Sequence, residues 1–283
     1  MIKLIATDMD GTVLGPDFRF RPRTLEAIAA AQEAGIEIVF VTGRPHRWLD
    51  PLWDQLKYDS VAICSNGAVV YDLARDEVLE SELVDGEVVL DLMGRLRRRL
   101  PRAKFCAETL EAVLEEENWG RTNLVETGDV EVGPIESRLD PSTGVIKLLV
   151  KDESMQPREL YEEVLDEAGD AVSVTHALAN LPLAEIGQPG LSKGRTLARW
   201  CAERGITADQ VAAFGDMPND TEMLRWATHG YAMGGGWPEV IEAVGRTCPP
   251  FEEDGVAQTI ERLIAEQSGQ AAPTGSPTAT ERA

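Results

Sequence analysis

The sequence predicts an α/β fold in which a Rossmann-like, parallel-sheet core carries an inserted α+β domain. In the first and last parts of the chain, short apolar runs alternate with amphipathic helical patterns, as in parallel sheets with right-handed crossovers. Several of these apolar runs end in a polar motif, as expected at the carboxyl edge of such a sheet. From about Glu82 the order of helices and strands changes, which indicates the insert.

The first predicted strand ends in two carboxylates. Asp8 and Asp10 follow the apolar run 4–6 and precede a Gly-Thr turn. Side chains alternate along an extended chain, so the two acids point the same way. Two like charges in a partly buried place are costly unless a cation or a proton compensates them. The pair suggests a Mg²⁺ site, a shared acid/base site, or both; an acidic turn is the alternative.

A second polar motif follows the second predicted strand. A helix leads from Thr24 to strand 36–41, and Thr42, Gly43 and Arg44 come next. A hydroxyl at a strand end, with a glycine amide beside it, can hold a phosphate oxygen. The alternative is an ordinary turn in which Thr42 is an N-cap.

Short elements are expected before the insert. Pro51 must lie in the first turns of its helix or bend that helix, and Asn66 lies in a turn after a strand. The predicted elements are a helix near 46–56, strand 61–64 and a hairpin formed by 68–71 and 78–80.

The insert mixes strands and helices around an acidic, glycine-containing stretch, 126–133. Its predicted elements are a helix at 87–99, strand-like pieces at 104–108 and 112–115, strand 145–150, a helix at 158–167, and strands 172–176 and 183–186.

Two further motifs follow the insert. Lys193 opens a helix, against the preference of the helix dipole, which suggests that it points at an anion; a solvated lysine is the alternative. Strand 211–214 ends in a glycine turn that carries Asp216 and Asp220. Asn219 or Asp220 as a simple helix cap is the alternative at that position.

In this order, the four motifs resemble those of the haloacid dehalogenase (HAD) superfamily of phosphotransferases, from the N-terminus to about residue 264. The position of the insert, Asn66-Gly67 and the hairpin after it are similar to the class IIB, Cof-type phosphatases, in which such an insert forms a cap. The resulting domain boundaries are a catalytic core of 1–82 plus 187–266, an α/β cap of 83–186 and a disordered tail of 267–283.

We expect Asp8 to be the nucleophile, because a carboxylate can attack phosphorus and form an aspartyl-phosphate. Asp10 would protonate the leaving oxygen and then deprotonate the attacking water. The resemblance implies the same roles. Transport ATPases of this superfamily have threonine at the second position, so the aspartate here indicates a phosphatase.

The remaining site residues are expected to bind metal and phosphate. Mg²⁺ prefers oxygen ligands, and its expected protein ligands are Asp8, the backbone carbonyl of Asp10, and Asp216. Asp220 would orient a metal-bound water or pair with Lys193. The expected phosphate- or substrate-binding groups are Lys193, Thr42, Asn219, Arg44, Asn66 and the backbone amides of Met9, Asp10 and Gly43.

Composition limits the partners. A net charge of −22 argues against nucleic acid and anionic membranes, and requires the phosphate site to be locally positive. The four cysteines form no Cys-x-x-Cys pair, so neither a zinc site nor a disulfide framework is indicated. No signal pattern and no apolar stretch of about 20 residues is present. We therefore expect a cytoplasmic monomer or homodimer.

These observations predict a Mg²⁺-dependent phosphatase of small phosphorylated metabolites, with sugar phosphates first and nucleotide-like or cofactor-precursor phosphates second. The alternatives are a flavin-pathway phosphoribitylamino-uracil phosphatase and a phosphomannomutase-like transferase, from which Thr42-Gly43-Arg44 departs. A non-catalytic binding protein would be expected to have lost Asp8, Asp10 or Lys193, and all three are present. The substrate itself depends on cap side chains that form no motif.

Overall fold

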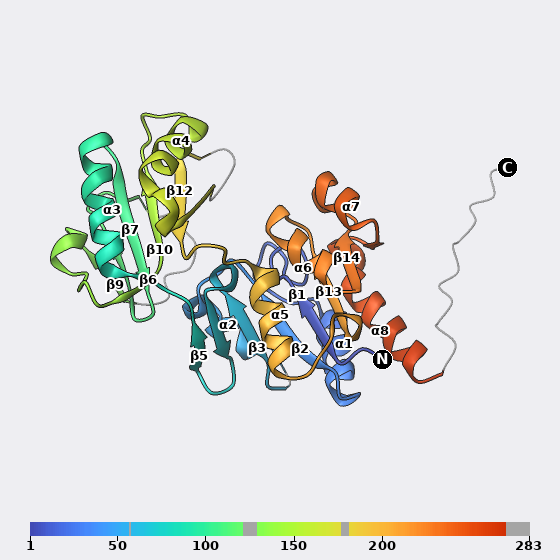
Figure 1. Ribbon diagram of the computed structural model, residues 1–283. Helices are drawn as coiled ribbons and strands as arrows, with labels where there is room; N and C mark the ends of the chain where they lie inside the picture. Colours follow the sequence, from blue (N-terminus) through green and yellow to red (C-terminus); the bar gives the residue numbers. More distant parts are fainter. Residues whose placement is uncertain (57, 121–128, 177–180, 270–283) are drawn as a thin grey trace. The chain divides into compact units, whose positions relative to one another are not determined.

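The computed structural model describes residues 1–56, 58–120, 129–176 and 181–269, which form two compact units (Figure 1). Among the described residues, the first unit comprises 1–41, 52–61 and 193–269, and the second comprises those of 42–51 and 62–192. The chain therefore leaves the first unit and later returns to it.

The first unit is built on a parallel sheet. β1 (Leu4–Thr7) lies between β2 (Glu37–Val41) and β13 (Val211–Gly215). The sheet continues from β13 to β14 (His229–Met233) and β15 (Thr247–Cys248), again in parallel. All residues of β1 and β13 are buried. Parallel strands end at the same edge, so the residues that follow β1 and β13 lie beside one another.

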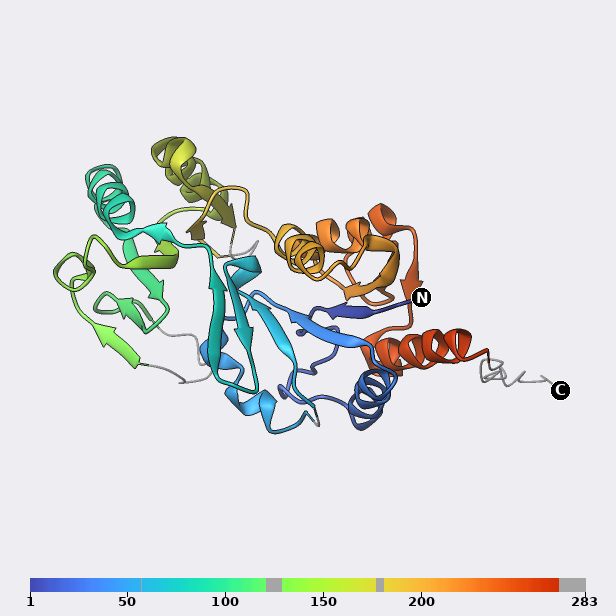
Figure 2. The same cartoon turned by 60° about the horizontal axis from the view of Figure 1, so that its bottom comes forward.

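Helices cover both faces of this sheet. Figure 2 shows α1 and α8 together on one side and α5 and α6 on the other. α1 begins before the predicted start at Thr24, because Pro22 suits the first turn of a helix. The helices are α1 (Pro22–Glu33), α5 (Lys193–Glu203), α6 (Thr221–Trp226), α7 (Pro238–Val244) and α8 (Gly255–Gln267).

The segment 46–56 does not form the single helix that the sequence suggests. It contains a 3-10 turn, His46–Trp48, and a short helix, α2 (Asp50–Trp53). Pro51 lies at the start of α2, because proline has no N–H to donate and is tolerated only in the first turn. The predicted strand and hairpin are present as β3 (Val61–Cys64) and the antiparallel pair β4 (Val69–Asp72) and β5 (Glu77–Ser81).

The second unit contains a mixed sheet with two helices. Its strand order is β11 (Ser173–His176), β12 (Leu183–Gly187), β10 (Gly144–Lys151), β7 (Lys104–Thr109), β8 (Ala112–Glu115) and β9 (Asp129–Val132), and β6 (Val84–Asp85) also pairs with β10. Within the described residues, every strand pairing of this sheet is antiparallel except that of β8 with β9. β9 lies in the acidic stretch 126–133, where no strand was predicted.

Helices α3 (Gly86–Arg99) and α4 (Pro157–Ala168) pack on one face of this sheet, as Figure 2 shows. Their buried residues, such as Leu92 and Leu160, form one core with Phe105 and Leu148 from the strands. The helices predicted at 87–99 and 158–167 are therefore found within one residue at each end.

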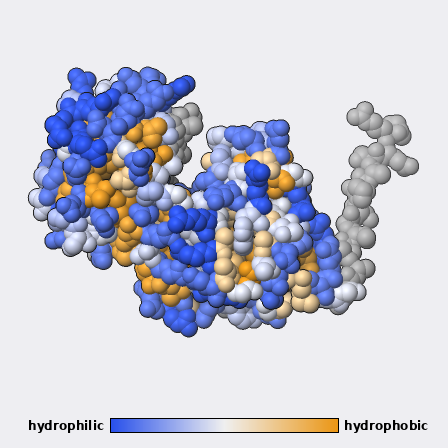
Figure 3. Space-filling model, viewed as in Figure 1, coloured by the Kyte–Doolittle hydropathy of each residue, from blue (hydrophilic) through white to orange (hydrophobic). Residues whose placement is uncertain are grey.

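Hydrophilic residues cover much of the face shown in Figure 3, in line with the high net charge. Among the described residues, the helices are all too short or too polar to cross a membrane. The sequence predicts a disordered tail at 267–283. Of these residues, 270–283 lie outside the described part of the chain.

Candidate active site

The first carboxylate of the site follows β1. The backbone N–H of Asp8 donates to the carbonyl of Phe214 at 2.9 Å, which ties the end of β1 to the end of β13. Asp8 is only 5% exposed. The local fold thus places a carboxylate in a buried position next to the loop that carries the other acids.

Lys193 joins two of the carboxylates. Its Nζ lies 2.6 Å from Asp8 Oδ1 and 2.7 Å from Asp220 Oδ1. All three side chains are almost fully buried. Lys193, at the first position of α5, is therefore an ion-pair partner inside the protein. The alternative interpretation, a solvated lysine on the surface, is wrong.

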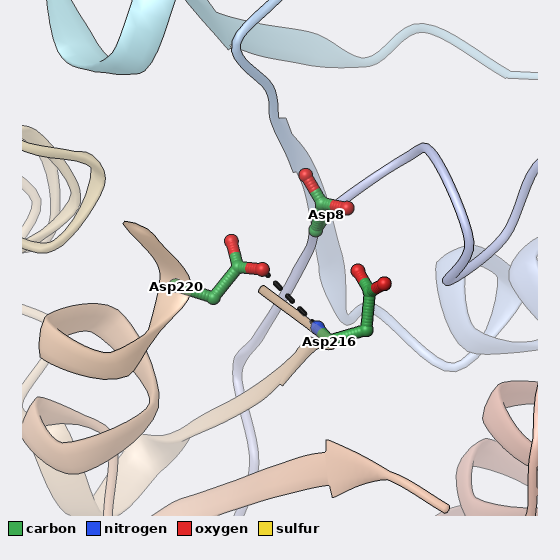
Figure 4. A group of neighbouring side chains, drawn as sticks. All are labelled: Asp8, Asp216 and Asp220. Carbon is green, nitrogen blue, oxygen red and sulfur yellow. Dashed lines mark hydrogen bonds between the residues drawn. The ribbon is translucent and has the colours of Figure 1, made fainter. Parts of the chain in front are cut away.

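Asp220 also fixes the loop after β13. Its Oδ2 accepts a hydrogen bond from the backbone N–H of Asp216 at 3.1 Å (Figure 4). The same oxygen accepts one from the backbone N–H of Met217 at 3.0 Å. A Cβ on Gly215 would come within 2.6 Å of the Asp220 side chain. Glycine is therefore needed at this position for the carboxylate to approach the backbone.

Asp216 completes the group. Asp8, Asp216 and Asp220 offer carboxylate oxygens that all lie within 4.8 Å of one another (Figure 4). The Thr12 hydroxyl donates to Asp216 Oδ1 at 3.3 Å. Gly11 has a left-handed φ of 77°, and a Cβ there would lie 2.8 Å from Asp216 Oδ2. Oxygen donors in this number and spacing suit a hard divalent cation such as Mg²⁺.

Burial and crowding change the acidity of these groups. Burial raises the pKa of Asp8 above its ordinary value, although the Lys193 ammonium opposes this. Burial and the Asp220 charge raise the pKa of Asp216 to about 6. Burial disfavours the Lys193 ammonium, but Asp8 and Asp220 outweigh that effect and raise its pKa. The site therefore holds a charged lysine among carboxylates that are costly to ionise together.

Three predicted residues lie close to this group in sequence. Asp10 is exposed, and its charge contributes to the raised pKa of Asp216. The Met9 side chain is buried, and its carbonyl accepts backbone hydrogen bonds from the turn that follows. Asn219 is exposed in a short turn next to Asp220.

The second polar motif belongs to the second unit, where it forms a group with Asn66. Thr42 Oγ1 accepts a hydrogen bond from the backbone N–H of Arg44 at 3.1 Å, and both residues are buried. The N–H of Asn66 donates to the Thr42 carbonyl at 3.0 Å. A Cβ on Gly43 would lie 3.3 Å from Asn66 Oδ1. The structure thus brings together the four residues predicted from two separate motifs.

Thr12 is a site residue that the sequence argument did not single out. Its hydroxyl orients Asp216, from a position two residues after Asp10. The Gly-Thr pair that directly follows the two acids was the available signal, since it places a small polar residue at the same sheet edge.

Comparison with known proteins identifies relatives along almost the whole chain. The sequence model of the haloacid dehalogenase-like hydrolase family matches residues 5–260. Pyridoxal phosphate phosphatase YbhA of Escherichia coli (strain K12) is 30% identical over 268 residues, which cover 91% of this chain and 97% of that protein. The 5-amino-6-(5-phospho-D-ribitylamino)uracil phosphatase YitU of Bacillus subtilis (strain 168) is 27% identical over 271 residues, with 92% and 97% covered.

A solved structure gives the same fold. The crystal structure of a haloacid dehalogenase-like hydrolase from Bacteroides thetaiotaomicron has a TM-score of 0.80 at 24% identity, and covers 93% of this chain and 100% of its own. The α/β fold with a Rossmann-like core, predicted from the strand and helix pattern, is thereby confirmed.

Proposed function

The chain belongs to the haloacid dehalogenase-like hydrolases, and on this premise we propose that it hydrolyses small phosphorylated metabolites through an aspartyl-phosphate on Asp8. Its named relatives include phosphatases, so the predicted class of enzyme is confirmed. The observation that carries the proposal is the buried contact of Lys193 with Asp8 and Asp220.

In the first step, a carboxylate oxygen of Asp8 attacks phosphorus and the ester P–O bond breaks. The leaving oxygen takes a proton from Asp10, so an alcohol departs and the phosphoryl group stays on Asp8. In the second step, Asp10 takes a proton from water, the water oxygen attacks phosphorus, and the bond to Asp8 breaks. Inorganic phosphate leaves, and both carboxyl groups regain their starting states.

Lys193 holds the nucleophile in place. Its ammonium fixes Asp8 Oδ1 at 2.6 Å and stays charged because of its raised pKa. A fixed positive charge beside the reacting carboxylate stabilises the negative charge that gathers on the phosphoryl oxygens. Thr42, Gly43, Arg44 and Asn66 are the further groups that we propose to bind the phosphate or the substrate.

Mg²⁺ is the proposed cofactor, and the donor set fits it. Asp8, Asp216 and the Asp10 carbonyl would hold the ion, which when bound supplies positive charge for the phosphoryl oxygens. The oxygens of Asp220 already accept hydrogen bonds from Lys193 and two backbone N–H groups, so Asp220 would act from outside the ligand set.

The substrate class is a phosphomonoester of a small metabolite. YbhA and YitU are named for different substrates, pyridoxal phosphate and 5-amino-6-(5-phospho-D-ribitylamino)uracil, although both align with almost the whole chain. YitU supports the flavin-pathway alternative as the second candidate. We propose a cytoplasmic enzyme whose catalytic core is 1–82 plus 187–266 and whose residues 83–186 act as a cap.

A substrate screen tests this function. Purified protein is assayed against sugar phosphates, pyridoxal phosphate and the phosphoribitylamino-uracil, with Mg²⁺ and with EDTA. We expect hydrolysis that needs the metal, because three crowded carboxylates repel a phosphate dianion. Full turnover in EDTA, or none on any ester, would contradict the proposal.

Two variants separate the roles of the carboxylates. Asp8→Asn should abolish turnover and the trapped phospho-enzyme, because no nucleophile is left. Asp10→Asn should slow both steps by about 10²–10⁴-fold, the usual worth of proton transfer, and an ester with a good leaving group should partly rescue the first step. Asp91→Asn, an exposed aspartate on α3, is the matched control. Near-normal rates for Asp8→Asn would rule out the mechanism.

A further inference from the structure

The backbone of Asp216 is held from two sides within the first unit. On one side its N–H donates to Asp220 Oδ2 at 3.1 Å (Figure 4). On the other side its carbonyl accepts a hydrogen bond from the backbone N–H of Trp237 at 2.9 Å. Trp237 follows β14, which lies beside β13 in the parallel sheet. The second contact therefore joins two loops at the same edge of the sheet.

The loop between β14 and α7 is shaped for this contact. It runs through Gly234, Gly235 and Gly236. The N–H of Gly236 donates to the carbonyl of Met233 at 2.9 Å, which closes a turn. A Cβ on Gly236 would lie 2.9 Å from the carbonyl oxygen of Asp216 and 3.1 Å from its Cα. Glycine at this position therefore lets the loop approach the backbone of Asp216 closely enough for the hydrogen bond.

The contact uses the backbone of Trp237 and not its indole. The residue is 40% exposed, and the atom that reaches Asp216 is the main-chain nitrogen. Trp237 precedes the first residue of α7 with a φ of −63°. Proline adopts the same φ but has no N–H. The donor can therefore be removed by a substitution whose own φ preference suits the position.

The place of the Asp216 carboxylate follows from these contacts. With the main chain held by Asp220 and Trp237, the Thr12 hydroxyl donates to Oδ1 of the side chain at 3.3 Å. Three separate segments of the chain thus fix one carboxylate in the acidic group. Mg²⁺ requires near-ideal octahedral geometry at about 2.0–2.1 Å. A small displacement of a ligand therefore weakens the binding of this ion.

We infer that Gly236 and Trp237 are positioning residues of the metal site, which hold Asp216 where its carboxylate binds Mg²⁺ and thereby set the affinity for the ion. This rests on the proposed function and its Mg²⁺ site, and deepens them. Groups that orient a metal ligand tune metal affinity without contacting the ion. The effect is on metal affinity and not on the chemical step, because a bound ion itself holds the Asp216 carboxylate in place.

A pair of variants isolates the N–H donor. Trp237→Pro and Trp237→Ala both lose the indole, but only the proline variant also loses the N–H. Metal-free protein is titrated with Mg²⁺ in a calorimeter. The dissociation constant should be at least about tenfold higher for Trp237→Pro than for Trp237→Ala, since the loss of a group that orients a metal ligand usually costs 10–100-fold in affinity. This measurement needs no substrate.

A second pair tests the close approach of the loop. Gly236→Ala keeps the N–H of Trp237 but crowds the Asp216 carbonyl, and should also raise the dissociation constant of Mg²⁺ by about tenfold. Gly235→Ala is the matched control, because its Cβ would meet only Pro250, at 3.6 Å, and it should leave the constant unchanged. A thermal melt in EDTA confirms that each variant is folded. If Trp237→Pro is not, the two glycine variants decide.

Kinetics separate positioning from a general loss of structure. Where the ester screen has found a substrate, the rate is measured as Mg²⁺ is increased. Trp237→Pro and Gly236→Ala should need more Mg²⁺ for half of their maximal rate, yet kcat at saturating Mg²⁺ should return close to the wild-type value. A change in binding with kcat unaltered is the signature of a lost binding contribution.

The outcomes separate the two proposals. A wild-type protein that binds no Mg²⁺ would overturn the metal site and the inference with it. A wild-type protein that binds Mg²⁺ but hydrolyses no ester would overturn the phosphatase function, and the calorimetric test would still decide the positioning role. Equal dissociation constants for folded Trp237→Pro and Trp237→Ala would overturn the role of Trp237 alone. A kcat that stays low at saturating Mg²⁺ would do the same, because the defect would lie in the chemical step.

Discussion

Lys193 is the residue on which the arrangement of the buried carboxylates depends. Removing its charge leaves Asp8 and Asp220 without their cation, in a place where neither is accessible to water. We expect Lys193→Met to lower the free energy of unfolding by about 3–5 kcal/mol and to abolish turnover. Urea unfolding in EDTA measures the first effect.

A double variant checks that explanation. Lys193→Met with Asp220→Asn removes one of the stranded charges, so it should regain part of the stability but no activity. Lys3→Met, at an exposed lysine, should change neither property. A double variant no more stable than Lys193→Met would show that the loss comes from packing rather than from unpaired charge.

The pH dependence of stability follows from Asp216, whose pKa of about 6 exceeds its ordinary value of 3.8. Between these values the folded chain holds a proton that the unfolded chain has lost, so stability falls as pH rises through this window and is level above it. In EDTA at pH 7.5, Asp216→Asn should therefore raise Tm by about 2–4 °C. At pH 4 the gain should nearly vanish, because the wild-type carboxyl is already protonated.

Calorimetry at the two pH values, with and without Mg²⁺, makes the measurement. Saturating Mg²⁺ should reverse the order of the two proteins, because only the wild type keeps the aspartate as a ligand. An equal gain in Tm at pH 4 and pH 7.5 would mean that the carboxylate charge is not the cause.

At the scale of elements, the loop after β13 depends on a close approach of side chain to backbone. Gly215→Ala puts a Cβ within 2.6 Å of Asp220, which must move away from Lys193 and from the N–H of Asp216. We expect kcat to fall at least about tenfold, the usual cost of a misplaced catalytic group being up to 10². Gly235→Ala is the control, since its Cβ would meet only Pro250 at 3.6 Å. Equal rates for both variants would contradict this account.

Most elements could be predicted from the sequence because apolar periodicity is local. The sequence also predicted that the motif at Asp8 lies next to the motif at Asp216. The two motifs follow β1 and β13, and parallel strands end at the same edge of a sheet. β9 was missed because its alternating acids, Asp129 and Glu131, mask the strand pattern. The pairing of Lys147 with Glu108 could not be predicted from the sequence either, because it depends on the register between two strands almost forty residues apart.

At the scale of the molecule, the carboxylates and Lys193 lie in the first unit, and the insert 83–186 lies in the second. A variant that joins Ser81 to Gly190 removes residues 82–189 and leaves the carboxylates and Lys193 in place. If it folds by circular dichroism, it should still bind Mg²⁺, measured by calorimetry, but lose most of its discrimination among phosphate esters. A folded variant with unchanged preferences would place specificity outside residues 82–189.

The single lysine among three carboxylates also imposes an order on events. Asp8, Asp216, Asp220 and Lys193 together carry two uncompensated negative charges when all are ionised. A phosphate dianion is repelled by that arrangement, and a divalent cation removes the repulsion by restoring neutrality. If Mg²⁺ is the cofactor, as proposed, we therefore expect the metal to bind before the substrate and the product phosphate to leave before the metal. On the same proposal, inhibition by free phosphate is expected only for the metal-loaded enzyme, so the supply of Mg²⁺ would control how strongly the enzyme responds to its own product.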